Sequence, residues 1–175
     1  MISRGLFGHV DQIAFVVPDV DKAVERWVRL FGAGPFFIIP GIRFPNWTYF
    51  GKPQDLPVDI AVGQLGDLQI EFVRPHRNIL SVYRHAMGET AIPHHLGLLV
   101  DNLADANALV ADEPVVTTGN STLGTPFTYN DTRASLGLMV ELIQRGPDVM
   151  MMFDHVRMAA QGWDGRDPLR RMPGA

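Results

Sequence analysis

The 175-residue chain contains no cysteine. Disulfides, thiolate metal ligands and thiol nucleophiles are therefore excluded, and any metal site must use nitrogen and oxygen ligands. No apolar run reaches the length of a membrane span, and the first residues lack the pattern of a cleaved signal, so we expect a cytoplasmic protein with no membrane partner. Acidic residues exceed basic ones only slightly, 19 against 15, which argues against nucleic acid as a partner. We expect a small-molecule ligand instead.

The chain repeats itself once. With 46% hydrophobic and 19% charged residues, its composition is that of a folded globular protein. The segment QIAFVVPDVDKAV, which starts at Gln12, resembles HLGLLVDNLADANALV, which starts at His95. The segment GDLQIEFVR, which ends at Arg74, resembles SLGLMVELIQ, which ends at Gln144. Because the order is the same in both halves, the sequence predicts an internal duplication.

Each half is predicted to contain a strand, a helix and three further strands. The apolar run 10–17 stops at Pro18, and Asp19 is the expected N-cap of the helix that follows. In the second half, Asn102 has the same place. We also expect a connecting helix over 78–88 and a C-terminal helix after residue 146, followed by an irregular tail. The other strands are expected at 36–39, 58–63, 68–73, 96–100, 115–118, 126–130 and 138–143.

Four polar residues occupy matching places in the two halves. Gln12 and His95 lie on the first strands, and Glu71 and Glu141 lie on the last ones, each between apolar neighbours. A buried carboxylate is costly unless it is paired, protonated or bound to a metal. If a pseudo-twofold axis relates the halves, the four side chains converge on one point. A set of one imidazole, two carboxylates and an amide oxygen suits one divalent ion of zinc, nickel, cobalt, manganese or iron.

Structural interpretations of the same residues stay open. Glu71 and Glu141 would also be stable if they bonded to the backbone or to arginines such as Arg74 and Arg145. The amide of Gln12 would be satisfied by a hydrogen bond to a neighbour. Side chains alternate along a strand, so His94 is expected to face away from the site and to be structural.

The duplicated unit, the HHLGLLVDN segment and the endings LQIEFVRP and LMVELIQ resemble the vicinal oxygen chelate superfamily. This is the superfamily of glyoxalase I, methylmalonyl-CoA epimerase, extradiol dioxygenases and the bleomycin-resistance proteins, and the resemblance covers residues 10–145. It implies an α+β fold in which two βαβββ modules form a half-open eight-stranded barrel around one cleft, with a C-terminal helix added. We expect a single domain over 1–175, with module one at about 8–75, a linker helix at about 78–88, module two at about 92–145, and the C-terminal helix and tail at 147–175.

The resemblance also implies a site and a reaction. Metal ligands in this superfamily come from the first and last strands of each module, which here means Gln12, Glu71, His95 and Glu141. Epimerases usually have histidine where this chain has Gln12, whereas some glyoxalase I enzymes have glutamine. We therefore expect a metal-dependent isomerase, epimerase or lyase that removes a proton next to a carbonyl. Glu71 or Glu141 would be the base, and the glyoxalase I pattern favours Glu141.

Aromatic residues cluster in the part of the first half that has no counterpart in the second. Phe44, Trp47, Tyr49 and Phe50 would form either a substrate-pocket wall or a flap or dimer contact, and we expect a homodimer. Three other functions stay open. A glyoxalase I proper would need a thiol-binding set that we do not find. An extradiol-type dioxygenase would need a histidine in place of Gln12. A metal-free protein that sequesters an aromatic compound would not need the four candidate ligands.

Overall fold

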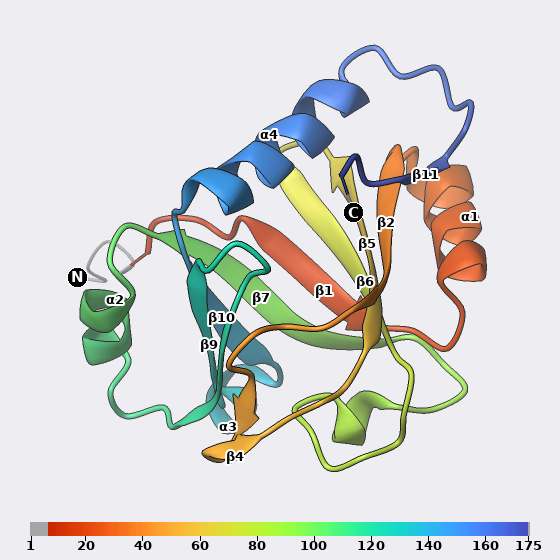
Figure 1. The fold of residues 1–175 in the computed structure, drawn as a ribbon. Coiled ribbons are helices and arrows are strands. Elements are labelled where there is room, and N and C mark those ends of the chain that lie inside the picture. Colours follow the sequence, from red (N-terminus) through yellow and green to blue (C-terminus); the bar gives the residue numbers. More distant parts are fainter. Residues whose placement is uncertain (1–6, 175) are drawn as a thin grey trace.

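The fold is built on one large curved sheet with helices on both of its faces (Figure 1). The computed structural model describes residues 7–174. The strands are β1 (Gln12–Val16), β2 (Phe36–Ile42), β3 (Thr48–Tyr49), β4 (Lys52–Pro53), β5 (Val58–Leu65), β6 (Leu68–Pro75), β7 (Ile92–Val100), β8 (Val115–Asn120), β9 (Pro126–Asn130), β10 (Met139–Gln144) and β11 (Leu169–Arg171). The helices are α1 (Val20–Phe31), α2 (Leu103–Leu109), α3 (Arg133–Leu136), α4 (Pro147–Ala160) and the 3₁₀ turn η1 (Arg84–Ala86).

The strand order confirms the predicted α+β fold and its duplication. The sheet has the order β11-β2-β5-β6-β1-β7-β10-β9-β8-β3-β4. The sheet contains the same four-stranded arrangement twice, as β1-β6-β5-β2 in the first half and β7-β10-β9-β8 in the second. The antiparallel pair of β1 and β7 joins the two halves. In each half the first strand runs parallel to the last one. The eight predicted strands are all present, and β3, β4 and β11 extend the sheet at its two ends.

The helices that follow the first strands cover one face of the sheet. The Asp19 side chain accepts a hydrogen bond from the Lys22 N–H, and that of Asn102 accepts one from Asp105, so both predicted N-caps are confirmed. Helix α1 ends where Gly32 adopts a left-handed conformation with φ 66°. Val24 of α1 packs in a cluster with Phe72, and Ala106 of α2 packs in a separate cluster with Leu142.

The opposite face holds the largest part of the core, and the candidate site lies on that face. Val62, Val73 and Met139 point to this side and pack in one cluster with Val156 of α4. Figure 1 shows α4 lying on the sheet next to β5. No helix among residues 7–174 has both the length and the apolar character that a membrane crossing requires.

Two expectations about the connections are wrong. The segment 78–88 forms only the single turn η1 instead of a helix. Its backbone makes a tertiary hydrogen bond in place of a helical one, because the Val82 carbonyl accepts from the His94 side chain. The tail is not wholly irregular, since β11 adds a parallel strand to the edge of β2. Both features depend on contacts with distant parts of the chain, which local patterns do not report.

Candidate metal centre

The two central strands bring the candidate residues to one face of the sheet. Ala14 of β1 lies between His95 of β7 and Glu71 of β6 in the ladder. Gly97 holds the equivalent place on β7, between Gln12 on β1 and Glu141 on β10. Each of these polar side chains therefore has a very small neighbour, so there is space for the polar groups above the middle of an otherwise packed sheet.

Glu71, His95 and Glu141 meet in this space. The Nε2 atom of His95 lies 3.2 Å from a carboxylate oxygen of Glu71 and 3.1 Å from one of Glu141. One ligand atom from each residue lies within 4.8 Å of the other two. His95 is fully buried, while each glutamate keeps 8% exposure, so solvent reaches the group past the carboxylates. Three of the four residues predicted from the repeat thus converge.

Gln12 lies beside this group but is engaged with another residue. Its Nε2 donates a hydrogen bond of 2.7 Å to Oε1 of Gln69, a buried residue on the neighbouring strand β6. The Oε1 of Gln12 is buried without a hydrogen-bond partner. Sequence reasoning did not identify Gln69, although its position two residues before Glu71 places it on the same face of the strand. The role of Gln12 as a metal ligand stays a prediction.

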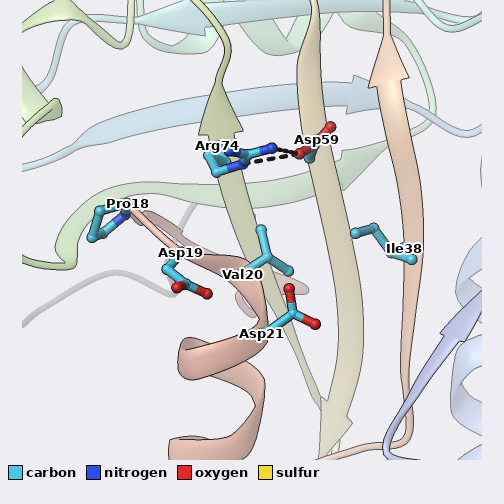
Figure 2. Close-up of a pocket in the computed structure, with 7 residues that line it drawn as sticks. All are labelled: Pro18, Asp19, Val20, Asp21, Ile38, Asp59 and Arg74. Carbon is cyan, nitrogen blue, oxygen red and sulfur yellow. Dashed lines mark hydrogen bonds and ion pairs between the residues drawn. The ribbon is translucent and has the colours of Figure 1, made fainter.

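The arginines considered as alternative partners bind elsewhere. The side chain of Arg74 donates to Asp59, and Figure 2 shows this pair beside a hollow at the start of α1, to which Asp19 and Asp21 also contribute. Arg145 forms an ion pair with Asp101. Neither arginine therefore explains the two buried glutamates, and His95 is the charged partner that they share.

A β-bulge changes the orientation expected for His94. Ala14 pairs with His95 and Phe15 pairs with Pro93, so His94 has no partner on β1. Such an extra residue interrupts the alternation of a strand. The ring of His94 therefore contacts Tyr83 and lies 2.9 Å from His95, Nδ1 to Nδ1. The expectation that His94 faces away from the site is wrong.

The charges of the group favour a cation at its centre. Burial alone lowers the pKa of His95, but the carboxylates of Glu141 and Glu71 outweigh it and raise the pKa to about 9. Burial raises the pKa of Glu71, although His95 offsets part of that effect. Burial also holds the pKa of His94 well below its usual range.

The donor set fits a divalent metal ion. Nε2 of His95 makes ion-pair contacts with both glutamates but a well-directed hydrogen bond with neither, and Oε1 of Gln12 has no partner. Buried polar atoms normally have hydrogen-bond partners, so these two atoms, which lie next to two carboxylates, are available as ligands once a binding metal ion displaces the proton of His95. Nitrogen and oxygen ligands of this kind are those of zinc and of the other divalent transition metals.

The predicted aromatic residues divide into buried and exposed members. Trp47 is buried, and its ring packs edge-on against Phe44 and Tyr83. Tyr49, on the short strand β3, contacts Phe50, which is 62% exposed. Phe44 and Trp47 therefore help to cover the core on the face of the sheet that carries the candidate site. Their predicted role as a substrate-pocket wall stays a prediction.

Comparison with known proteins shows which family the chain represents. The sequence profile of the glyoxalase/bleomycin resistance protein/dioxygenase superfamily matches residues 11–129. The chain belongs to this superfamily. The matched range includes Gln12, Glu71 and His95 and ends before Glu141. No curated protein sequence matches the chain.

Solved structures share this glyoxalase fold at low sequence identity. Methylmalonyl-CoA epimerase from Mycobacterium tuberculosis is 17% identical with a TM-score of 0.58, and the match covers 86% of this chain and 97% of that one. A hypothetical protein from Bacillus halodurans is 14% identical with a TM-score of 0.56, covering 79% and 94%. A methylmalonyl-CoA epimerase in complex with methylmalonyl-CoA is 15% identical with a TM-score of 0.51, covering 79% and 94%. At these identities the likeness concerns the fold alone.

Proposed function

We propose that this glyoxalase-superfamily protein is a metal-dependent isomerase, epimerase or lyase that removes a proton next to a carbonyl group. The observation that carries the proposal is the buried contact of His95 with both Glu71 and Glu141. Two carboxylates and an imidazole that converge on one point suit the binding of one divalent ion and the transfer of a proton beside it. Gln12 is the fourth proposed ligand, through the Oε1 atom that has no other partner.

A bound divalent ion would polarise the substrate carbonyl and stabilise the negative charge that develops on its oxygen. The glutamates move the proton. We assign Glu141 as the base that takes the α-hydrogen, and Glu71, which also contacts Nε2 of His95, as the group that returns a proton from the opposite face. This division would invert the configuration at the α-carbon. Burial raises the pKa of Glu71, which brings its proton affinity closer to neutral pH, as proton transfer requires.

The proposed substrate combines a carbonyl group with an apolar part. Its apolar part would lie against Phe44, Trp47, Tyr49 and Phe50, of which the first three pack in the core cluster on the same side of the sheet as the carboxylates. Because structural neighbours include an epimerase bound to methylmalonyl-CoA, this thioester is the first compound to test. Other acids with a proton next to a carbonyl form the next group.

Deuterium exchange tests the proposal directly. The zinc-, cobalt- or nickel-loaded protein is incubated with methylmalonyl-CoA in deuterated water, and deuterium at the α-carbon is followed by mass spectrometry. We expect metal-dependent incorporation, a loss of at least about 100-fold in Glu141→Gln, and no change in the matched control Glu25→Gln on the exposed face of α1. Equal exchange by the metal-free protein would refute the assigned chemistry.

The runner-up is a metal-free protein that sequesters an aromatic compound. It is favoured by the aromatic side chains around Trp47, and it predicts tight binding of aromatic ligands by protein stripped of metal.

The expectations of a cytoplasmic location and of a homodimer also stay proposals. The mass in solution, measured by light scattering, tests the second.

A further inference from the structure

The hydrogen bonds of His94 determine where its hydrogen lies. Its Nε2 atom lies 3.1 Å from the carbonyl oxygen of Val82. A carbonyl oxygen only accepts hydrogen bonds, so Nε2 of His94 must carry a hydrogen and donate it. The other ring nitrogen, Nδ1, lies 2.9 Å from Nδ1 of His95. One hydrogen must therefore lie between these two nitrogens.

That hydrogen belongs to His95. If Nδ1 of His94 carried it, His94 would hold two hydrogens and a positive charge. The residue is 1% exposed, its ring neighbours are Tyr83, Tyr129 and two histidines, and no ion pair from a carboxylate to it occurs among residues 7–174. A buried charge without a partner of opposite sign is strongly unfavourable. His94 is therefore neutral and accepts, while Nδ1–H of His95 donates.

We propose that His94 is a positioning residue that keeps a hydrogen on Nδ1 of His95, so that Nε2 is the nitrogen that faces Glu71 and Glu141 and binds the metal. The inference rests on the proposed metal site, because it says how that site obtains its nitrogen ligand. The second nitrogen of a metal-bound histidine commonly donates to a carbonyl or carboxylate. Here a second histidine takes that place, and the Val82 carbonyl fixes its orientation in turn.

The bulge makes this arrangement possible. A regular strand would place His94 on the opposite face from His95, the face on which Leu98 and Val100 of β7 pack with Ala106 of α2. The extra residue on β7 turns the His94 ring toward His95 and toward the segment that contains Val82. β-bulges are common beside active sites, where they redirect a side chain in this way.

Metal affinity measured on three variants tests the proposal. His94→Phe keeps a flat ring but removes both nitrogens, and the dissociation constant for zinc or cobalt should rise 10- to 100-fold. His94→Asn places an amide oxygen where it can accept from Nδ1–H of His95, and should restore most of the affinity. The matched control is His85→Phe, because His85 stacks on His94 and has no hydrogen bond to His95. It should bind metal like the wild type.

Nuclear magnetic resonance of the wild-type protein gives a second readout that needs no variant. In zinc-loaded protein, proton–nitrogen correlation spectra should show a hydrogen on Nδ1 of His95 and zinc on Nε2. Zinc on Nδ1, or unchanged affinity in folded His94→Phe, overturns the role of His94 but leaves the metal site standing. Absence of metal binding by the wild type overturns the proposed function and this inference together.

Discussion

Gly97 lies directly opposite Gln12, and the amide of Gln12 occupies the space that a side chain at position 97 would need. A Cβ atom on Gly97 would lie 2.8 Å from Oε1 of Gln12 and 2.9 Å from its Cβ. Real Cβ atoms do not approach other atoms so closely, and the Cβ of Gln12 is fixed to the backbone of β1. The absence of a side chain at 97 thus determines where Gln12 lies.

Gly97→Ala should therefore destabilise the fold and displace Gln12. We expect a loss of about 1–3 kcal/mol in the free energy of unfolding, as for other overpacked sites, measured by urea denaturation. If Gln12 is the fourth ligand, metal affinity should fall as well. Gly88→Ala is the control, since a Cβ there meets nothing within 4 Å. Equal stability of the two variants would show that β1 and β7 adjust to the extra methyl group.

Removal of the imidazole should abolish metal binding. We expect one divalent ion per wild-type chain and none in His95→Ala, measured by elemental analysis after dialysis against metal-free buffer. His9→Ala is a matched control, because His9 lies away from the group and binds Asp11 in an exposed position. Full metal occupancy in His95→Ala would show that the ion, if any, is held elsewhere.

The metal-free protein should become less stable as the pH rises from about 6.5 to about 9. The pKa of His95 is about 9 in the folded protein and about 6.5 in the unfolded chain. The folded state therefore holds this proton more tightly, and the stabilisation is complete below pH 6.5 and lost as the pH passes through 9. It amounts to at most about 3 kcal/mol. Urea denaturation at pH 6 and at pH 9.5 measures the difference.

His95→Gln provides the control for this pH dependence, because it keeps a polar side chain that does not titrate. Its free energy of unfolding should vary less over the same range than that of the wild type. A wild-type stability that is equal at pH 6 and pH 9.5 contradicts the assigned proton.

The first half of the chain should not fold alone. In a fragment of residues 1–88, β1 would lose its antiparallel partner β7 and would become an exposed edge. The cluster on the site face would also lose its members from the second half, among them Phe127, Met139 and Val156. We expect no cooperative thermal transition by circular dichroism. A cooperative transition would mean that one module is an independent domain.

Local patterns in the sequence were enough for most of the fold. The apolar runs and the caps at Asp19 and Asn102 depend on neighbouring residues, so the positions of α1 and α2 and of the eight repeated strands followed from the sequence. The duplication added a long-range constraint. Because equivalent strands meet across a pseudo-twofold arrangement, matching Glu71 with Glu141 was sufficient to predict that both approach His95.

Tertiary contacts decided the remainder. Some features are choices among local conformations of similar free energy. They include the bulge of β7 at His94, the absence of a helix over 78–88, and the acidic partner of Arg74. Contacts with distant residues decide between them. The Val82 carbonyl accepts a hydrogen bond from His94, Asp59 accepts one from Arg74, and Gln69 accepts one from the amide of Gln12. The sequence determined which polar residues lie on the apolar sheet, and only the packed structure decided the hydrogen-bond partner of each, because partners far apart in the chain leave no periodic pattern in it.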